Sequence, residues 1–226
     1  MSSENWRSRW VTDKCEIALA LANGQIGAGY SEAAILICAI LNALAAEAWL
    51  GQKLDRVRFI ELLAKMATSL PSPALISVPL LIQDLRDELL SNEADSLARV
   101  LMPFETSLVI TGLDVDKSEP ELLLICPSIP VNLLRKNSYA CLLYEEVRSS
   151  YAHEYRPGDR ADSWPMTRKT NQCVSYINKI TERCIHFHVE WLARLAIELA
   201  EKPDELDTKL PLPAPQQWWI KSVPIK

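Results

Sequence analysis

The chain has 226 residues, of which 49% are hydrophobic and 23% charged, and its formal net charge is −5 at pH 7. This length supports one substantial core, or one core with a modest insertion. The negative charge excludes nucleic-acid binding through bulk charge and leaves room only for a local basic patch. With six glycines and abundant alanine and leucine, the composition favours helix over sheet. We predict a mainly α fold, with a domain at 1–202, an irregular insertion at 103–130 and a tail at 203–226.

The cysteines and the apolar stretches indicate the compartment. The six cysteines form no C-x-x-C pair and no regular framework, which predicts free, mostly buried thiols in a reducing compartment, the cytoplasm. The first residues lack the apolar core of a signal peptide, so we expect no export. The most apolar stretch, 33–50, contains Asn42 and Glu47. We interpret it as the central helix of a soluble bundle and not as a membrane span.

Apolar residues at helical spacing predict several helices in the first hundred residues. Ser31 is a suitable N-cap for the long apolar helix, and Gly51 ends it. Pro71 closes the amphipathic helix that follows. The predicted helices cover residues 10–22, 31–50, 54–70, 80–90 and 93–101.

The pattern changes between residues 103 and 130. Leu108-Val-Ile-Thr and Leu122-Leu-Leu-Ile are short apolar runs typical of strands, and the segment between them is polar and rich in turn formers. We therefore predict an extended insertion with a small hairpin. The remaining expected elements are a helical stretch from Pro130 or Asn132 to 155, a polar loop at 156–165, a long helix at 169–201 and a proline-rich tail that wraps the domain or a partner.

Chemistry-bearing residues gather where the helix before residue 156 is predicted to end. The chain reads Arg148-Ser-Ser-Tyr-Ala-His153-Glu-Tyr155 and then stops helix formation with Arg156-Pro157-Gly158. Arginine stays charged at physiological pH, whereas imidazole has an unperturbed pKa near roughly 6.5 and can both accept and donate a proton. A fixed cation, a proton carrier and a phenol at one helix end suit phosphodiester chemistry.

Arginine followed by histidine four to six residues later is a weak signal by itself. A second match occurs at Arg183-Cys-Ile-His-Phe-His188. We place that match in the middle of the predicted helix 169–201, among apolar neighbours. The match that starts at Arg148 ends instead at a proline-glycine turn, where side chains reach solvent and ligand, and this context favours it.

In that context the segment resembles the HEPN superfamily, small helical proteins whose motif is R-x(4–6)-H near the end of a helix in a bundle. The match here is Arg148, four intervening residues and His153, and Tyr155 completes the extended form R-x4-H-x-Y. The likeness covers the eight motif residues well and the helices from 10 to 201 only loosely. The insertion and the tail fall outside it.

The resemblance implies a metal-independent endoribonuclease without a cofactor, often a toxin or a defence effector, that acts as a homodimer with its active site at the two-fold interface. Arg148 would bind the RNA phosphate bidentately, His153 would move protons, and Tyr155 would help position the phosphate. In some relatives the matching tyrosine is modified with AMP by a nucleotidyltransferase antitoxin, and such a partner is a hypothesis for this chain. Weaker RNA contacts are expected from Ser149, Arg156 and Arg160.

The geometry of an ideal α-helix separates the two main residues of the motif. At about 100° per residue, Arg148 and His153 differ by about 140° around an ideal helix, so they do not share a face. Either the last turn loosens or a second subunit contributes. In the alternative interpretation Arg148 pairs with Glu145, Glu154 or another carboxylate, and His153 caps the helix through its dipole. The protein would then be a catalytically silent helical protein for RNA binding or protein interaction.

Two other patterns carry less weight. Residues 135–169 hold seven basic side chains against five acidic ones, and a mixed solvated surface is the simpler interpretation. His186 and His188, with Cys173 and Cys184, suggest zinc by residue type alone. Their spacings fit no familiar site, and residues two apart on a helix point away from each other. We therefore expect no metal site.

Overall fold

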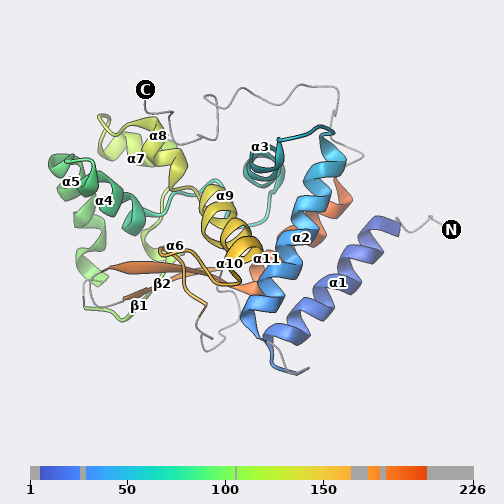
Figure 1. Cartoon of the computed structure of the whole chain (residues 1–226). Helices are drawn as coiled ribbons and strands as arrows, with labels where there is room; N and C mark the ends of the chain where they lie inside the picture. Colours follow the sequence, from blue (N-terminus) through green and yellow to red (C-terminus); the bar gives the residue numbers. More distant parts are fainter. Residues whose placement is uncertain (1–5, 26–28, 105, 164–172, 179–181, 203–226) are drawn as a thin grey trace.

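The computed structural model describes residues 6–25, 29–104, 106–163, 173–178 and 182–202. These residues form mostly helices and one three-stranded sheet, which confirms the predicted mainly α fold (Figure 1). The tail at 203–226, and with it the prediction that the tail wraps the domain, lies outside the described residues. None of the six cysteines forms a disulfide, and all six are buried, as predicted.

Three helices build the larger part of the core. Helices α1 (Trp6–Ala22), α2 (Tyr30–Ala48) and α11 (Val189–Glu201) pack against one another, and α2 also contacts the helices on its other side (Figure 1). Covered on several sides, α2 can be apolar nearly all round. By length and composition α2 could cross a membrane, but half of its apolar window is buried inside the structure. The prediction of a central core helix is confirmed.

The ends of the early helices differ from the prediction. Ser31 is the second residue of α2 and not its N-cap; Gly29 is the cap, and its N–H donates to the Glu32 carboxylate at 2.9 Å. The helix predicted at 54–70 is α3 (Asp55–Glu61), continued by a π-helical turn, η1 (Leu62–Met66). The helix ends before residue 70, and the backbone N–H groups of Thr68 and Ser69 donate to the Glu198 carboxylate of α11 at 2.5 and 2.9 Å instead of continuing the helix.

A second, smaller hydrophobic cluster lies under four short helices. These are α4 (Val78–Asp87), α5 (Ser91–Leu101), α7 (Glu119–Ile125) and α8 (Val131–Lys136), and a 3-10 turn, η2 (Met102–Phe104), follows α5. Their apolar faces meet through fully buried side chains such as Leu81, Leu97, Leu122 and Leu134. In Figure 1 they lie together on the side of the molecule away from α1.

The predicted hairpin within the insertion is wrong. Strand β1 (Val109–Thr111) exists, but the second apolar run lies in α7. Ser118 starts that helix through a capping box, in which its N–H and hydroxyl donate to Glu121 at 2.8 and 2.6 Å. Between strand and helix stands the short α6 (Gly112–Val115). Periodicity alone does not separate so short an apolar run into strand or helix.

The long helix predicted at 169–201 is also wrong. Its first part is the antiparallel pair β2 (Val174–Asn178) and β3 (Arg183–Phe187), and helix resumes only at α11. Strand β2 is the middle strand, since β1 pairs with its other edge in the register Val109↔Ile177. Four of the five β3 residues are buried, so the strand shows no alternation between apolar and polar positions. That continuous burial explains why a helical spacing also fitted the segment.

Candidate active site

The motif lies on one continuous helical stretch that changes its geometry twice. The stretch comprises α9 (Tyr139–Leu142), the π-helical η3 (Leu143–Ser149) and α10 (Ser150–Glu154). A π-helix bonds i to i+5 and is wider than an α-helix, and such turns frequently occur at functional sites. The Ser150 hydroxyl donates to the Glu145 carbonyl, five residues back, at 3.0 Å. The helix is therefore loosened, but around Arg148 and not in the last turn.

The helix ends where the sequence predicts. Tyr155 adopts a left-handed conformation with φ 55°, and its N–H donates to the Tyr151 carbonyl. The following loop folds back onto η3, because the Gly158 N–H donates to the Glu146 carbonyl at 2.7 Å. A Cβ atom on Gly158 would lie 3.1 Å from the Glu146 Cα and 2.1 Å from a Glu146 carboxylate oxygen, so a larger residue would force the Glu146 side chain to move.

Arg148 is half-buried and faces α2. Its Nη2 lies 3.5 Å from Oδ1 of Asn42, and its guanidinium carbon lies 5.2 Å from the centroid of the Tyr144 ring, a cation–π distance. The two carboxylates suggested as its partners bind elsewhere. Glu145 pairs with Arg56 at 2.5 Å, and Glu154 pairs with Arg156 at 2.7 Å.

Within the described part of the chain, no carboxylate pairs with Arg148. The predicted alternative pairing of Arg148 with Glu145 or Glu154 is therefore wrong. Its contacts are an amide oxygen at long distance and an aromatic face, both of which leave most of the guanidinium N–H groups available.

A cavity of about 220 Å³ opens beside Arg148, between α2 and the motif helix. Its other lining residues are Ile35, Cys38, Ala39, Asn42, Tyr151 and Ala152. Burial raises the pKa of the Cys38 thiol to about 12, although the Arg148 charge lowers it, so Cys38 stays protonated and is no nucleophile. The cavity thus combines apolar walls with one unneutralised cation.

His153 occupies a different position from Arg148. It lies in the last turn of α10, its side chain is exposed, and it does not line the cavity. Of the groups that the structure describes, none is a hydrogen-bond partner of its ring. The place near a helix C-terminus also suits the dipole role of the alternative interpretation. In one chain the structure presents Arg148 at the cavity and His153 at the surface.

Tyr155 is tied to the start of α2. Its hydroxyl donates to Oε1 of Glu32 at 2.7 Å, a bond that lowers the pKa of Glu32 and raises the pKa of Tyr155. Glu32 and Asn42 are ten residues apart on α2, hence about 15 Å along its axis. Arg148 and Tyr155 therefore contact α2 three turns apart, and the structure does not bring them together.

The three weaker RNA-contact residues are dispersed. Ser149 is half-buried at the end of η3, and Arg156 is exposed in its pair with Glu154. Arg160 is engaged inside the fold: its Nη2 donates to Asn137 Oδ1 at 2.6 Å, and its Nη1 lies 3.4 Å from Asp84. RNA contact through these residues stays a prediction, and Arg160 already has a structural role.

The second arginine-histidine match and the histidines of the zinc pattern lie in and just after a strand, and not in a helix at 169–201 as predicted. His186 lies in β3 and His188 directly after it, and on a strand residues two apart point to the same side. Their ring centroids are 5.0 Å apart. His188 Nε2 lies 2.9 Å from Ser175 Oγ, and His186 Nδ1 lies 3.0 Å from the Asp162 carbonyl. Both rings are buried, which removes this match from contact with a polymer.

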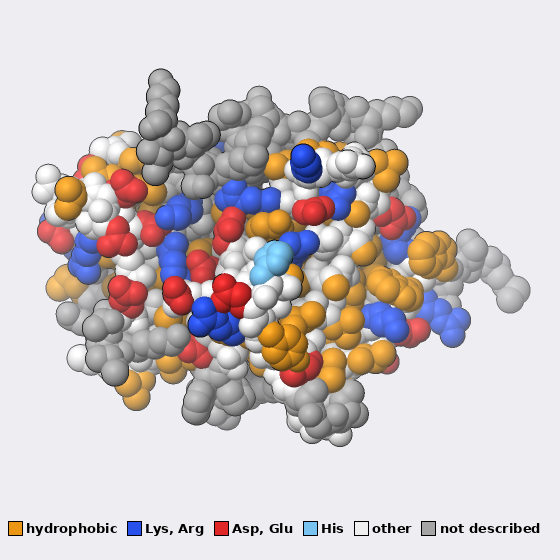
Figure 2. Space-filling model, viewed as in Figure 1, with side chains coloured by type: hydrophobic (Ala, Val, Ile, Leu, Met, Phe, Trp, Pro, Cys, Tyr) orange, Lys and Arg blue, Asp and Glu red, His pale blue; other side chains and the backbone are white. Residues whose placement is uncertain are grey.

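No metal centre emerges from these residues. Across residues 6–202, apart from the undescribed gaps, no group of three or more His, Cys, Asp or Glu side chains is placed to hold an ion. The face shown in Figure 2 has Lys and Arg side chains beside Asp and Glu side chains, without a broad area of one charge. Any RNA contact on this face depends on local groups more than on a wide basic surface.

Sequence analysis missed Asn42, Tyr144 and Glu32 as neighbours of the motif. Asn42 carried a signal, because it is a polar residue within the apolar stretch 33–50. The antiparallel packing of α2 against the motif helix, which brings Asn42 to Arg148 and Glu32 to Tyr155, has no local signature in sequence. Tyr144 lies on the motif helix itself, four residues before Arg148.

Protein-family models, curated proteins and solved structures were compared with the chain. None of them matches it.

Proposed function

We propose that the protein is a metal-independent endoribonuclease of the HEPN type, which cleaves RNA by attack of a 2′-hydroxyl on the neighbouring phosphate. The observation that carries this proposal is Arg148. Its guanidinium lines an open cavity and has no paired carboxylate among the described residues, while Glu145 and Glu154 are bound to other arginines. A half-buried, unneutralised guanidinium is suited to a phosphate group, which it can bind through two N–H donors.

The chemistry needs one cation and two proton transfers. The 2′-oxygen loses its proton and bonds to phosphorus, and the bond to the 5′-oxygen breaks as that oxygen gains a proton. The products are a 2′,3′-cyclic phosphate and a 5′-hydroxyl. Arg148 stabilises the negative charge on the phosphorane, and an exposed imidazole such as His153 can take or give the protons.

We further propose that two copies of the motif act together in a homodimer. His153 does not line the cavity of its own Arg148, so a site that combines the two groups takes its imidazole from a second subunit. A two-fold axis near the end of α10 would place the surface His153 of each subunit by the cavity of the other. The loosened η3 turn supports the same arrangement, because it presents Arg148 toward α2.

We also propose a toxin or defence role, with a nucleotidyltransferase-type antitoxin as partner. The resemblance implies this role, and Tyr155 would be the residue that the antitoxin modifies. Its hydroxyl is at the surface, since Tyr155 is 61% exposed, and it donates to Glu32. Transfer of AMP from ATP to that oxygen, with release of pyrophosphate and the phenol proton, would remove the hydrogen-bond donor and place a phosphate beside a carboxylate. The helix end would then separate from α2, which would switch the site off.

Cleavage of single-stranded RNA in the presence of EDTA tests the nuclease. Wild-type protein should give 2′,3′-cyclic phosphate ends, and Arg148→Ala or His153→Ala should lower the rate by roughly 10²- to 10⁴-fold. Arg9→Ala, at an exposed position on α1, is the matched control and should leave the rate unchanged. If the wild-type protein leaves RNA intact, the catalytically silent function in RNA binding or protein interaction is favoured instead.

Mixing the two inactive variants tests the composite site. In a heterodimer of Arg148→Ala and His153→Ala, one of the two shared sites keeps both groups, so a 1:1 mixture should recover about a quarter of the wild-type activity. If both groups of a site come from one chain, mixing recovers nothing, and the dimer proposal fails while the nuclease stands.

A further inference from the structure

Helix α1 carries a row of exposed apolar side chains. Trp6, Trp10 and Ile17 are 70%, 40% and 41% exposed, whereas Val11 and Ala18 of the same helix are fully buried. At about 100° per residue, the three exposed side chains lie within about 40° of one another around the helix. We call this row the α1 stripe. Figure 2 shows hydrophobic side chains on the surface over α1, at the right of the molecule. Single exposed apolar residues are ordinary, but an aligned row with two tryptophans is typical of a protein interface.

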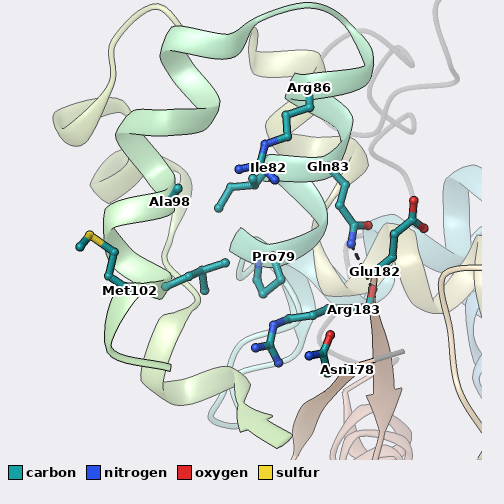
Figure 3. A pocket seen from close by; sticks show the side chains of 10 residues that line it. Pro79, Ile82, Gln83, Arg86, Ala98, Met102, Asn178, Glu182 and Arg183 are labelled. Atoms are coloured by element: carbon teal, nitrogen blue, oxygen red, sulfur yellow. Dashed lines mark hydrogen bonds between the residues drawn. The ribbon is translucent and has the colours of Figure 1, made fainter. Parts of the chain in front are cut away.

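The α1 stripe is not the rim of a cavity. The cavity beside Arg148 lies on the other side of α2, between α2 and the motif helix (Figure 1). A larger cavity, of about 390 Å³, opens between α4, α5 and β3 (Figure 3). No residue of α1 lines either cavity. Small molecules bind mainly in concave sites, so a convex apolar row of this kind suits a protein partner.

Helix α1 is held firmly in the fold, so the stripe is presented without rearrangement. Arg7 forms an ion pair with Glu47 of α2 at 2.6 Å. On the side of α11, Sγ of Cys15 lies 3.8 Å from the Ala193 carbonyl oxygen. A surface that is already ordered loses little conformational entropy when a partner binds.

Two opposite charges follow one edge of the α1 stripe. Arg9 and Asp13 lie about 60° and about 20° from Trp6 around the helix, on the side away from Trp10. Both are exposed, and neither has an ion-pair partner among the residues that the structure describes. They are about one helical turn apart, so a second copy of this edge running in the opposite direction would bring each charge to its opposite.

The charges of α1 argue against a lipid surface as the partner. Asp13 lies within the arc of the stripe, and the exposed Glu16 adds a second negative charge, so these two offset Arg9 and Lys14. A helix that binds anionic lipids carries an excess of lysine and arginine on its polar face. Balanced charges beside an apolar row instead give the complementarity that a protein contact uses.

We propose that the α1 stripe is a self-association surface, on which α1 of a second copy packs antiparallel about a two-fold axis at the level of residue 11. Trp6 of each copy then lies opposite Ile17 of the other, and the two Trp10 rings meet close to the axis. Arg9 of each copy lies at the level of Asp13 of the other, along the same edge. The stripe thus complements itself, as a two-fold contact requires.

This contact is separate from the proposed nuclease dimer, because α2 lies between α1 and the motif helix (Figure 1). By itself the α1 contact gives a dimer, and together with the contact near the end of α10 it joins two nuclease dimers. Breaking the α1 contact lowers the mass of the particle to that of a monomer or of the nuclease dimer. RNA cleavage reports on the nuclease proposal independently, because no residue of the stripe lines the cavity beside Arg148.

Sedimentation equilibrium of the full chain at about 100 μM tests the interface. Wild-type protein should associate through α1 with a dissociation constant of about 10 μM or tighter, and Trp10→Glu should lower the particle mass because it places a charge in the stripe. Leu124→Glu is the matched control, since Leu124 of α7 is 85% exposed and lies outside the stripe, and this variant should keep the wild-type mass. Equal masses for wild type and Trp10→Glu would overturn the proposal.

Exchange of the two charges tests the antiparallel arrangement. Asp13→Arg and Arg9→Asp should each weaken the association by about tenfold or more, because each places like charges opposite one another twice in the two-fold contact. A 1:1 mixture of the two variants should associate as tightly as wild type, since two basic residues of one chain then face two acidic residues of the other. A mixture that associates no more tightly than either variant alone would refute the arrangement.

Discussion

Asp116 is predicted to make the protein more stable at pH 5 than at pH 8. This buried carboxylate joins three elements: Oδ2 accepts the hydroxyl of Tyr139 in α9 and, at 2.6 Å, that of Tyr176 in β2, and Oδ1 accepts the Val78 N–H of α4 at 2.9 Å. Burial raises the pKa of Asp116 from 3.8 to about 7, although these donors lower it.

The direction follows from proton binding. Between pH 3.8 and about 7, folded Asp116 holds a proton that the unfolded chain has released, so stability is present at low pH and falls as the pH rises toward 7. From pH 5 to the folded pKa is about two pH units, and at 1.36 kcal/mol per unit the loss is about 2.7 kcal/mol. Burial lowers the pKa of His186, which acts in the opposite direction in part of this window.

The comparison of wild type with Asp116→Asn therefore isolates the effect. Urea unfolding at pH 5 and pH 8 gives two free energies of unfolding for each protein, and the difference between the two pH values should be larger in wild type by about 2.5 kcal/mol. Asp114→Asn, at an exposed position of α6, is the control and should behave like wild type. Equal pH dependence in wild type and Asp116→Asn would show that Asp116 is already ionised at pH 5 and would refute the reasoning.

Two further substitutions test structural contacts. Burial raises the pKa of Glu198, but hydrogen bonds from Ser69, Thr68 and Lys202 outweigh burial and hold this pKa at about 2. The stabilisation by the ionised carboxylate is therefore lost as the pH falls below 4.5. Glu198→Gln should lower the free energy of unfolding by about 1 to 3 kcal/mol at pH 7 and by less at pH 3. Equal losses in urea titrations at both pH values would contradict this. Arg160→Ala should lower the free energy of unfolding by about 2 to 3 kcal/mol, because the buried Asn137 and Asp84 lose the guanidinium that they bind. An unchanged thermal midpoint would show that Arg160 has no structural role and would favour a role in RNA binding.

Helices could be predicted from the sequence where apolar residues lay on one face only, or where a helix-terminating residue such as glycine or proline marked the end. The helix around α2 was predicted to within two residues at each end, since its apolar run stops before Gly51. The β2–β3 pair was missed because both its faces are covered, which removes alternation, and because β1, its third strand, lies more than sixty residues earlier in the chain. No local pattern reports such a pairing.

The candidate site was predictable in composition but not in arrangement. The sequence pointed to Arg148, His153 and Tyr155 through residue type and the turn after them. It could not show that Arg148 faces Asn42 while Tyr155 binds Glu32, because both contacts depend on how α2 lies against the motif helix. Glu145 is engaged by Arg56 of α3, and Glu154 by Arg156 in the loop that follows.

The π-helical turn at Leu143–Ser149 has a consequence for insertions and deletions. A turn that bonds i to i+5 contains one more residue than a turn that bonds i to i+4. Deleting one residue within η3 would let the whole stretch run as α-helix and would leave the later side chains near their present orientation, whereas the same deletion in an α-helical turn would rotate them by about 100°. In such a motif, the type of turn that carries the arginine, α or π, therefore says more about the relative direction of the arginine and histidine side chains than the number of residues between them does.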